Sequence, residues 1–190
     1  MNPGLHQDGV MKIDRRTFTN GLAAFGAAGI VGLPGFANAT PIAGFEPEPW
    51  FAPTTGDLRK DLAAADASGK YLALLWEQKG CQYCHRLHTV NFQFDEITDL
   101  GKKHFHTFQM DLWGKRPFVD FDGKTRSEAD IAKARGVRAT PVILFFDGAG
   151  KEVFRMPGYA EPAVQFAIYR FVAEKGYADG SFLDWINKQS

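Results

Sequence analysis

The sequence predicts an α/β domain whose mixed central sheet is flanked by helices, with an export segment in front of it. Apolar runs that suit buried strands alternate with helical patterns in the first part of the chain, which favours parallel strands joined by helices. Later, two apolar runs flank the turn segment 147–150, which indicates an antiparallel hairpin. The 190 residues are 45% hydrophobic, so the chain can bury one packed core.

The front half of the domain alternates helices and strands. Apolar residues at helical spacing predict a helix over 57–68, and the run Tyr-Leu-Ala-Leu-Leu-Trp predicts a buried strand over 70–77. A helix follows the two cysteines and is expected to run to about Leu100, before a second strand over 104–111.

The back half adds the hairpin and a closing helix. We expect 112–125 to be a loop with a turn at Asp122-Gly123. The remaining elements are a capped helix over 127–135, strands over 141–147 and 151–156, a helix over 161–176 and a short helix over 181–187. The helical spacing predicts that the closing helix packs through Val164, Ile168, Phe171 and Val172.

Residues 1–39 have the layout of a secretory signal peptide: a charged start, an apolar middle rich in small residues, and the Ala-x-Ala end Ala37-Asn38-Ala39. The pair Arg15-Arg16 resembles the twin-arginine export signal. We therefore expect cleavage after Ala39, a periplasmic mature protein and no stable membrane insertion. An uncleaved anchor, the general export route and a start at Met11 remain alternatives.

Residues 40–55 are expected to form an extended lead-in to the domain at 56–190. This segment contains four prolines, which disfavour a helix. Trp50 and Phe51 are expected to fix the lead-in to the domain surface.

The formal charge gives no reason to expect a nucleic-acid or anionic-lipid partner. The chain carries 22 basic and 22 acidic side chains, which balance to zero. Binding to phosphate backbones depends on an excess of positive charge, so neither partner class is predicted.

The two cysteines, Cys81 and Cys84, are separated by Gln82 and Tyr83. A disulfide that closes so short a loop adds little stability, so chemistry is the better reason for the pair. At the first turn of a helix, Cys81 would meet unpaired amides that favour its thiolate and would be the attacking group. Cys84, one turn inside the helix, would resolve the mixed disulfide.

Other interpretations of the pair stay open at this point. Cys81, Cys84 and His88 could supply three zinc ligands, although a second cysteine pair is missing. The segment from Cys81 to His85 also matches the c-type haem attachment pattern, which would need a distal ligand such as Met110. The pair could also be purely structural.

A second motif makes the chain resemble the thioredoxin superfamily. A strand, Cys-x-x-Cys and a helix are followed later by Arg138-Ala139-Thr140-Pro141 at the start of a strand. The resemblance implies a cis Pro141 beside the cysteines and a Thr140 backbone that pairs with substrate. It also implies that Gly158 leaves room for a peptide and that Tyr83 faces substrate. It implies neither a cofactor nor a metal.

Within that superfamily, the chain is most similar to the SoxW-like branch of exported thioredoxins, from about Trp50 to Tyr177. The matching segments are 80–84, 119–123, 137–142, 145–147 and 158–159. This resemblance implies thiol–disulfide exchange with protein substrates, in bacterial sulfur oxidation or in periplasmic disulfide reduction. A reductase in that compartment would need a membrane electron donor, and a redox-inactive adaptor is the alternative.

The chain departs from the family at the position of its buried acid, six residues before the first cysteine, where it has Leu75. Glu77 could take over as proton acceptor for Cys84, or could be a solvated strand end. His85 and His88 could stabilise the thiolate as imidazolium, or could be ordinary surface histidines.

Overall fold

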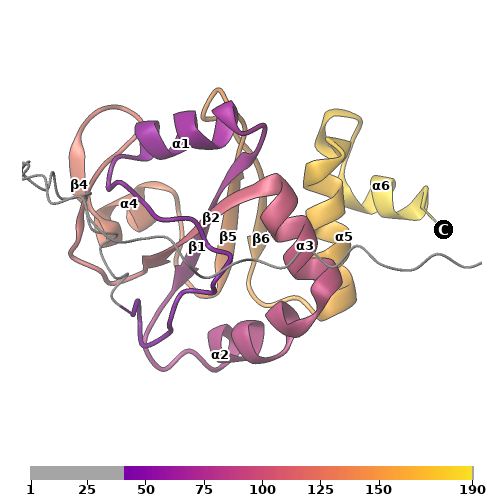
Figure 1. The fold of residues 1–190 in the computed structure, drawn as a ribbon, viewed down its shortest axis with the longest axis horizontal. Helices are drawn as coiled ribbons and strands as arrows, with labels where there is room; N and C mark the ends of the chain where they lie inside the picture. The colour runs from indigo at the N-terminus through magenta and orange to yellow at the C-terminus, as the bar shows by residue number, and fades with distance from the viewer. Residues whose placement is uncertain (1–40, 190) are drawn as a thin grey trace, which may run out of the picture. The chain divides into compact units, whose positions relative to one another are not determined.

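A computed structural model describes residues 41–189, so the predicted export segment lies outside the described residues. The domain is built around a four-stranded sheet with the order β2-β1-β5-β6 and carries a separate two-stranded sheet, β3-β4 (Figure 1). The α-helices are α1 (Leu58–Ala67), α2 (Gln82–Thr89), α3 (Asp95–His104), α4 (Glu128–Ala134), α5 (Pro162–Ala173) and α6 (Phe182–Asn187). The strands are β1 (Tyr71–Glu77), β2 (Phe105–Asp111), β3 (Pro117–Val119), β4 (Thr125–Ser127), β5 (Val142–Phe146) and β6 (Glu152–Pro157).

The pairing of the strands confirms the predicted mixed sheet. β1 and β2 are parallel, and the chain crosses between them through α2 and α3. β5 pairs antiparallel with both β1 and β6, so the late hairpin forms one side of the sheet. The central strand β1 is therefore parallel to one neighbour and antiparallel to the other.

The two faces of the sheet are both covered by helices (Figure 1). Alternate residues of a strand point to opposite faces. In β1, Leu72, Leu74 and Trp76 belong to the core beneath α1 and α4, whereas Ala73 and Leu75 belong to the core beneath α2, α3 and α5. This alternation decides which β1 side chains lie under the cysteine helix.

The helix after the cysteines does not continue to Leu100, contrary to the prediction. It ends at Thr89, and a 3₁₀ turn (Asn91–Gln93) separates it from α3. The Thr89 hydroxyl donates to a carbonyl in the preceding turn, an arrangement that often bends helices. The buried Asn91 amide donates to the Gln165 side chain at 2.6 Å, which fixes the break against α5.

The region predicted as a loop over 112–125 contains β3 and the first residue of β4, which pair as a hairpin. Its turn is where the sequence placed it, because Gly123 adopts a φ of 81° that favours glycine. Both strands have only three residues, so alternation along the sequence was too short to reveal them.

The closing helix α5 buries a slightly different face from the predicted one. Ile168, Phe171 and Val172 are buried as expected, but Val164 is exposed and Gln165 is fully buried in its place. Gln165 faces inward because it accepts the hydrogen bond from Asn91.

The lead-in packs on the domain through its aromatic residues, as predicted. The rings of Trp50 and Phe51 each contact Phe92. Trp50 also covers Gly101 of α3, where a Cβ atom would lie only 2.7 Å from the indole ring. No helix within residues 41–189 is long and apolar enough to cross a membrane.

Candidate functional site

Cys81 and Cys84 form a disulfide at the start of α2. Cys81 is the N-cap of the helix, and its sulfur accepts a hydrogen bond from the Cys84 backbone N–H at 3.0 Å. Cys81 is 9% exposed and Cys84 is fully buried. The sulfur that can meet a partner is therefore the one that the helix start also stabilises as a thiolate.

The second motif lies against the first. The Thr140–Pro141 peptide bond is cis, and the Thr140 carbonyl oxygen lies 3.6 Å from the Cys81 sulfur. Gly158 directly follows Pro157, which pairs with Val142 on the neighbouring strand. Gly158 has a φ of 99°, and a Cβ there would meet no atom within 4 Å. The structure thus brings the cysteines, Thr140 and Pro141 together and leaves open space at Gly158.

Tyr83 forms part of an exposed aromatic rim beside the disulfide. Its side chain is 58% exposed, and its ring stacks on Tyr159 at 5.7 Å. The Arg86 guanidinium lies over the Tyr159 ring, with its central carbon 4.9 Å from the ring centroid. Asn91 accepts a hydrogen bond from the Tyr159 hydroxyl at 2.8 Å. Tyr159 is identified from the sequence only as part of a segment that matches the family, and its contact with Tyr83 is not predicted there.

A small hollow of about 300 Å³ opens beside Cys81 and is lined by Phe45, Gly80, Cys81, Gln82 and His85. His85 lies at the exposed surface, as the alternative interpretation of that histidine held. Phe45 comes from the lead-in, where a tight turn pairs Ile42 with Phe45. Sequence reasoning did not predict that the lead-in would reach the cysteines.

Glu77 and His88 are buried together beneath the helix. By alternation along β1, Glu77 lies on the same face as Leu75, the position of the family's acid. The Glu77 side chain is fully buried, so its interpretation as a solvated strand end is wrong. Its carboxylate accepts from Gln109 Nε2 at 2.7 Å and lies 2.9 Å from His88 Nε2. His88 is likewise not a surface histidine.

The second nitrogen of His88, Nδ1, lies 2.7 Å from Glu48 of the lead-in. Burial by itself would lower the pKa of His88, but the hydrogen bonds and negative charges of Glu77 and Glu48 raise it above the ordinary value. The imidazolium form is therefore favoured between the two carboxylates.

The zinc interpretation does not fit this arrangement. Both ring nitrogens of His88 are engaged with carboxylates, and Cys81 and Cys84 are bonded to each other. Among residues 41–189, no group of three or more His, Cys, Asp or Glu side chains could hold a metal ion.

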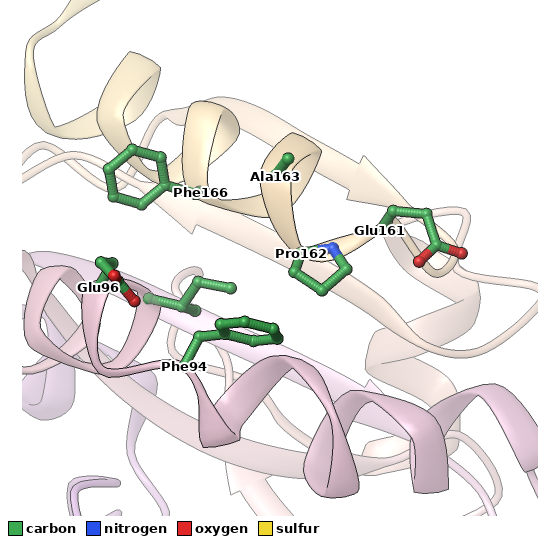
Figure 2. A pocket seen from close by; sticks show the side chains of 7 residues that line it. Phe94, Glu96, Glu161, Pro162, Ala163 and Phe166 are labelled. Atoms are coloured by element: carbon green, nitrogen blue, oxygen red, sulfur yellow. The ribbon is translucent and has the colours of Figure 1, made fainter.

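A larger, apolar hollow of about 570 Å³ lies away from the sulfurs, between the N-terminal ends of α3 and α5 (Figure 2). It is lined by Phe94, Glu96, Ile97, Glu161, Pro162, Ala163 and Phe166. An ion pair between Glu161 and Arg86 at 3.1 Å connects it to α2. Because it contains no cysteine and no part of the Pro141 segment, it is distinct from the redox site.

Comparison with solved structures supports the fold. A thioredoxin-fold protein from Helicobacter pylori is 21% identical, with a TM-score of 0.56 over 70% of this chain and 96% of that one. A thioredoxin from Thermus thermophilus is 24% identical, with a TM-score of 0.50 over 64% of this chain and 88% of that one. The comparison with curated protein sequences finds no match.

A family model described as a thioredoxin-like domain matches residues 58–173, which is more than half of the chain. The match includes the cysteine pair, Glu77, His88 and Pro141, whereas the lead-in residues Phe45 and Glu48 lie outside it. With a Cys-x-x-Cys disulfide at the start of α2, the domain has the fold of a disulfide oxidoreductase. The chain therefore belongs to the thioredoxin-like domain family.

Proposed function

We propose that the protein is an exported thiol–disulfide oxidoreductase that reduces disulfides in partner proteins. The observation that carries this proposal is the position of the Cys81 sulfur, 3.6 Å from the Thr140 carbonyl oxygen and next to the cis Pro141 bond. A substrate backbone laid along Thr140 would bring its own sulfur to Cys81, because the Thr140 carbonyl lies 3.6 Å from the Cys81 sulfur.

The exchange takes place in two steps. The Cys81 thiolate attacks one sulfur of the substrate disulfide, so that a Cys81–substrate bond forms and the substrate S–S bond breaks. The Cys84 thiol then loses its proton and attacks the Cys81 sulfur, which forms the Cys81–Cys84 disulfide and releases the second substrate thiolate. Two electrons pass from the pair to the substrate.

Each half of the pair is suited to its step. The Cys84 N–H and the start of α2 stabilise the Cys81 thiolate. Cys84 is fully buried, so it meets only a sulfur already held at Cys81. Glu77, buried on the face of β1 that lies under α2, is the proposed proton acceptor for Cys84.

The cellular setting is part of the proposal. The signal layout of residues 1–39 supports export to the periplasm through the twin-arginine route with cleavage after Ala39. The resemblance to the SoxW-like branch supports a reductase, with a membrane electron donor and a link to sulfur oxidation. Tyr83, Thr140 and Gly158 are the proposed substrate contacts.

Insulin reduction with dithiothreitol tests the exchange chemistry. We expect the wild-type protein to accelerate insulin precipitation and Cys81→Ser to show only the uncatalysed rate, because the attacking sulfur is gone. Equal behaviour of the two proteins would instead indicate a redox-inactive adaptor. A titration of the pair against glutathione then sets the direction, since a potential near the thioredoxin value of about −270 mV indicates a reductase.

A further inference from the structure

The buried pair Glu77 and His88 is connected to the surface by a single lead-in residue, Glu48. The side-chain exposure rises in order, from 0% at Glu77 to 9% at His88 and 16% at Glu48. The two links are short, 2.9 Å and 2.7 Å. The three side chains therefore form a continuous hydrogen-bonded path from beneath α2 to solvent.

The proposed chemistry needs such a path because the resolving step releases a proton inside the protein. Cys84 is fully buried, so water cannot take its proton directly. Cys84 and His88 are four residues apart on α2 and therefore lie on one helix face. Glu77 lies on the β1 face below that helix.

The partners of Glu77 can serve either protonation state of its carboxyl group. The His88 ring can donate or accept at each nitrogen, and the Gln109 amide can turn to present its oxygen instead of its nitrogen. Gln109 Oε1 is buried and has no hydrogen-bond partner among the described residues, so it is free to accept from a protonated Glu77 after such a turn.

The other neighbours of His88 do not compete for the proton. Phe45 stacks on the imidazole with an interplanar angle of 2°, and Phe51 and Phe92 meet it edge-on. Within residues 41–189, Glu77 and Glu48 are the charged groups found within hydrogen-bond distance of the ring. The aromatic rings cover the faces of the imidazole, and Glu48 is the more exposed of the two carboxylates that contact it.

We propose that Glu48 is the solvent-side end of a proton path that serves Cys84, which makes the lead-in a working part of the redox site. The proposal rests on the proposed exchange function. As Cys84 attacks, its proton moves to Glu77, and the His88 imidazolium, which then faces a neutral carboxyl group, passes its Nδ1 proton to Glu48. Glu48 then releases it to water, so that one proton leaves for each disulfide formed.

The test compares Glu48→Gln with the matched control Glu46→Gln. Glu46 belongs to the same lead-in and lines the same surface hollow as Glu48 and His88, but the lead-in carboxylate that bonds to His88 is Glu48. The amide at position 48 keeps the shape and a hydrogen bond but cannot take up the proton. The resolving step is followed by stopped-flow with a disulfide peptide, and the attack step is measured separately in a Cys84→Ser background.

We expect Glu48→Gln to slow the resolving step about tenfold near neutral pH, which is less than the roughly hundredfold or more of a direct proton acceptor, because Glu48 acts at the far end of the path. The attack step and the Glu46→Gln rates should be unchanged. Glu48→Gln should also change the pH profile and the solvent isotope effect of the resolving step, which a purely structural role would not alter, and Glu48→Asp should restore part of the rate.

An unchanged resolving rate and pH profile in Glu48→Gln would overturn the proton path while leaving the exchange function intact. Failure of the proposed function would look different, because the wild-type protein itself would show neither step. A thermal unfolding curve for each variant separates these outcomes from loss of the fold.

Discussion

Two buried glutamates lie near the same edge of the sheet, and they are neutralised in opposite ways. Glu77 ends β1, and Glu128 begins α4 and accepts a hydrogen bond from the backbone N–H of Asp111, the residue paired with Glu77. Glu77 is 0% exposed and Glu128 1%. The partners of Glu128 are that N–H and the Arg116 guanidinium at 2.5 Å.

The difference lies in what the partners can do. A guanidinium and a backbone N–H only donate, so the partners of Glu128 match a carboxylate and offer no acceptor for a proton on it. His88 and the Gln109 amide can both donate and accept, so they tolerate a proton on Glu77. Burial of a carboxylate therefore does not by itself indicate chemistry, and the partners decide between a fixed structural ion and a group that can exchange a proton.

The largest expected effect is a loss of folding stability when the Glu128–Arg116 ion pair is broken. Arg116→Ala should lower the free energy of unfolding by about 2 kcal/mol, because it leaves the Glu128 charge buried without its cation. The Arg116 side chain is 41% exposed, which keeps the loss below that of a fully buried pair. Urea unfolding at pH 7 measures it. His88→Gln, which leaves Glu77 a neutral donor, should cost less, and the reverse order would contradict the comparison.

The next largest effect is on the rate of the resolving step, and we expect it at Glu77. Glu77→Gln should slow the resolving step about tenfold or more, because the proposed proton acceptor of Cys84 is removed. Glu128→Gln should leave that rate unchanged even where it lowers stability. Stopped-flow measurement of both variants checks this. If the two variants slowed the step equally, the distinction drawn between the glutamates would be lost.

The smallest effect is a pH dependence of stability that His88 confers. The fold raises the pKa of His88, so the folded chain binds more protons than the unfolded chain, whose histidine titrates near 6.5. The His88 contribution is therefore complete below about pH 6.5 and is lost as pH rises through the folded pKa. The slope cannot exceed about 1.4 kcal/mol per pH unit for one proton.

Urea titrations of the oxidised protein between pH 6 and 9 measure this slope, since the disulfide-bonded cysteines do not titrate. His88→Gln should flatten it, and Glu48→Gln should reduce it because one of the two carboxylates that favour the imidazolium loses its charge. Arg116→Ala should leave the His88 slope in place. An equally steep loss of stability in His88→Gln would show that another group is responsible.

Much of the fold could be predicted because its signals are local. Apolar runs bounded by glycine marked β1 and β5, and Ser127 and Gly136 marked the ends of α4 correctly. The break in the helix after the cysteines was missed, because it is fixed by hydrogen bonds of Asn91 to residues far along the chain. Contacts of that kind leave no trace in local periodicity.

The same distinction between local signals and long-range contacts applies to the site. The Cys-x-x-Cys spacing predicted the roles of the two cysteines, and a family motif predicted the role of Pro141. The roles of Glu77 and His88 stayed undecided, because burial at a strand end depends on what covers it. Glu48 could not be found at all, since nothing in a proline-rich segment indicates that one of its carboxylates lies 2.7 Å from a helix residue 40 positions later.

The close approach of Trp50 to the buried Gly101 links α3 to the cysteine site. Trp50 and Glu48 are two residues apart in the lead-in, so the packing that positions the Trp50 indole also positions the Glu48 carboxylate. Any side chain larger than hydrogen at position 101 would push against the indole at 2.7 Å and lift the segment. Natural variants of the protein should therefore tolerate change at this glycine only together with a smaller residue at position 50, a paired substitution that sequence covariation would reveal.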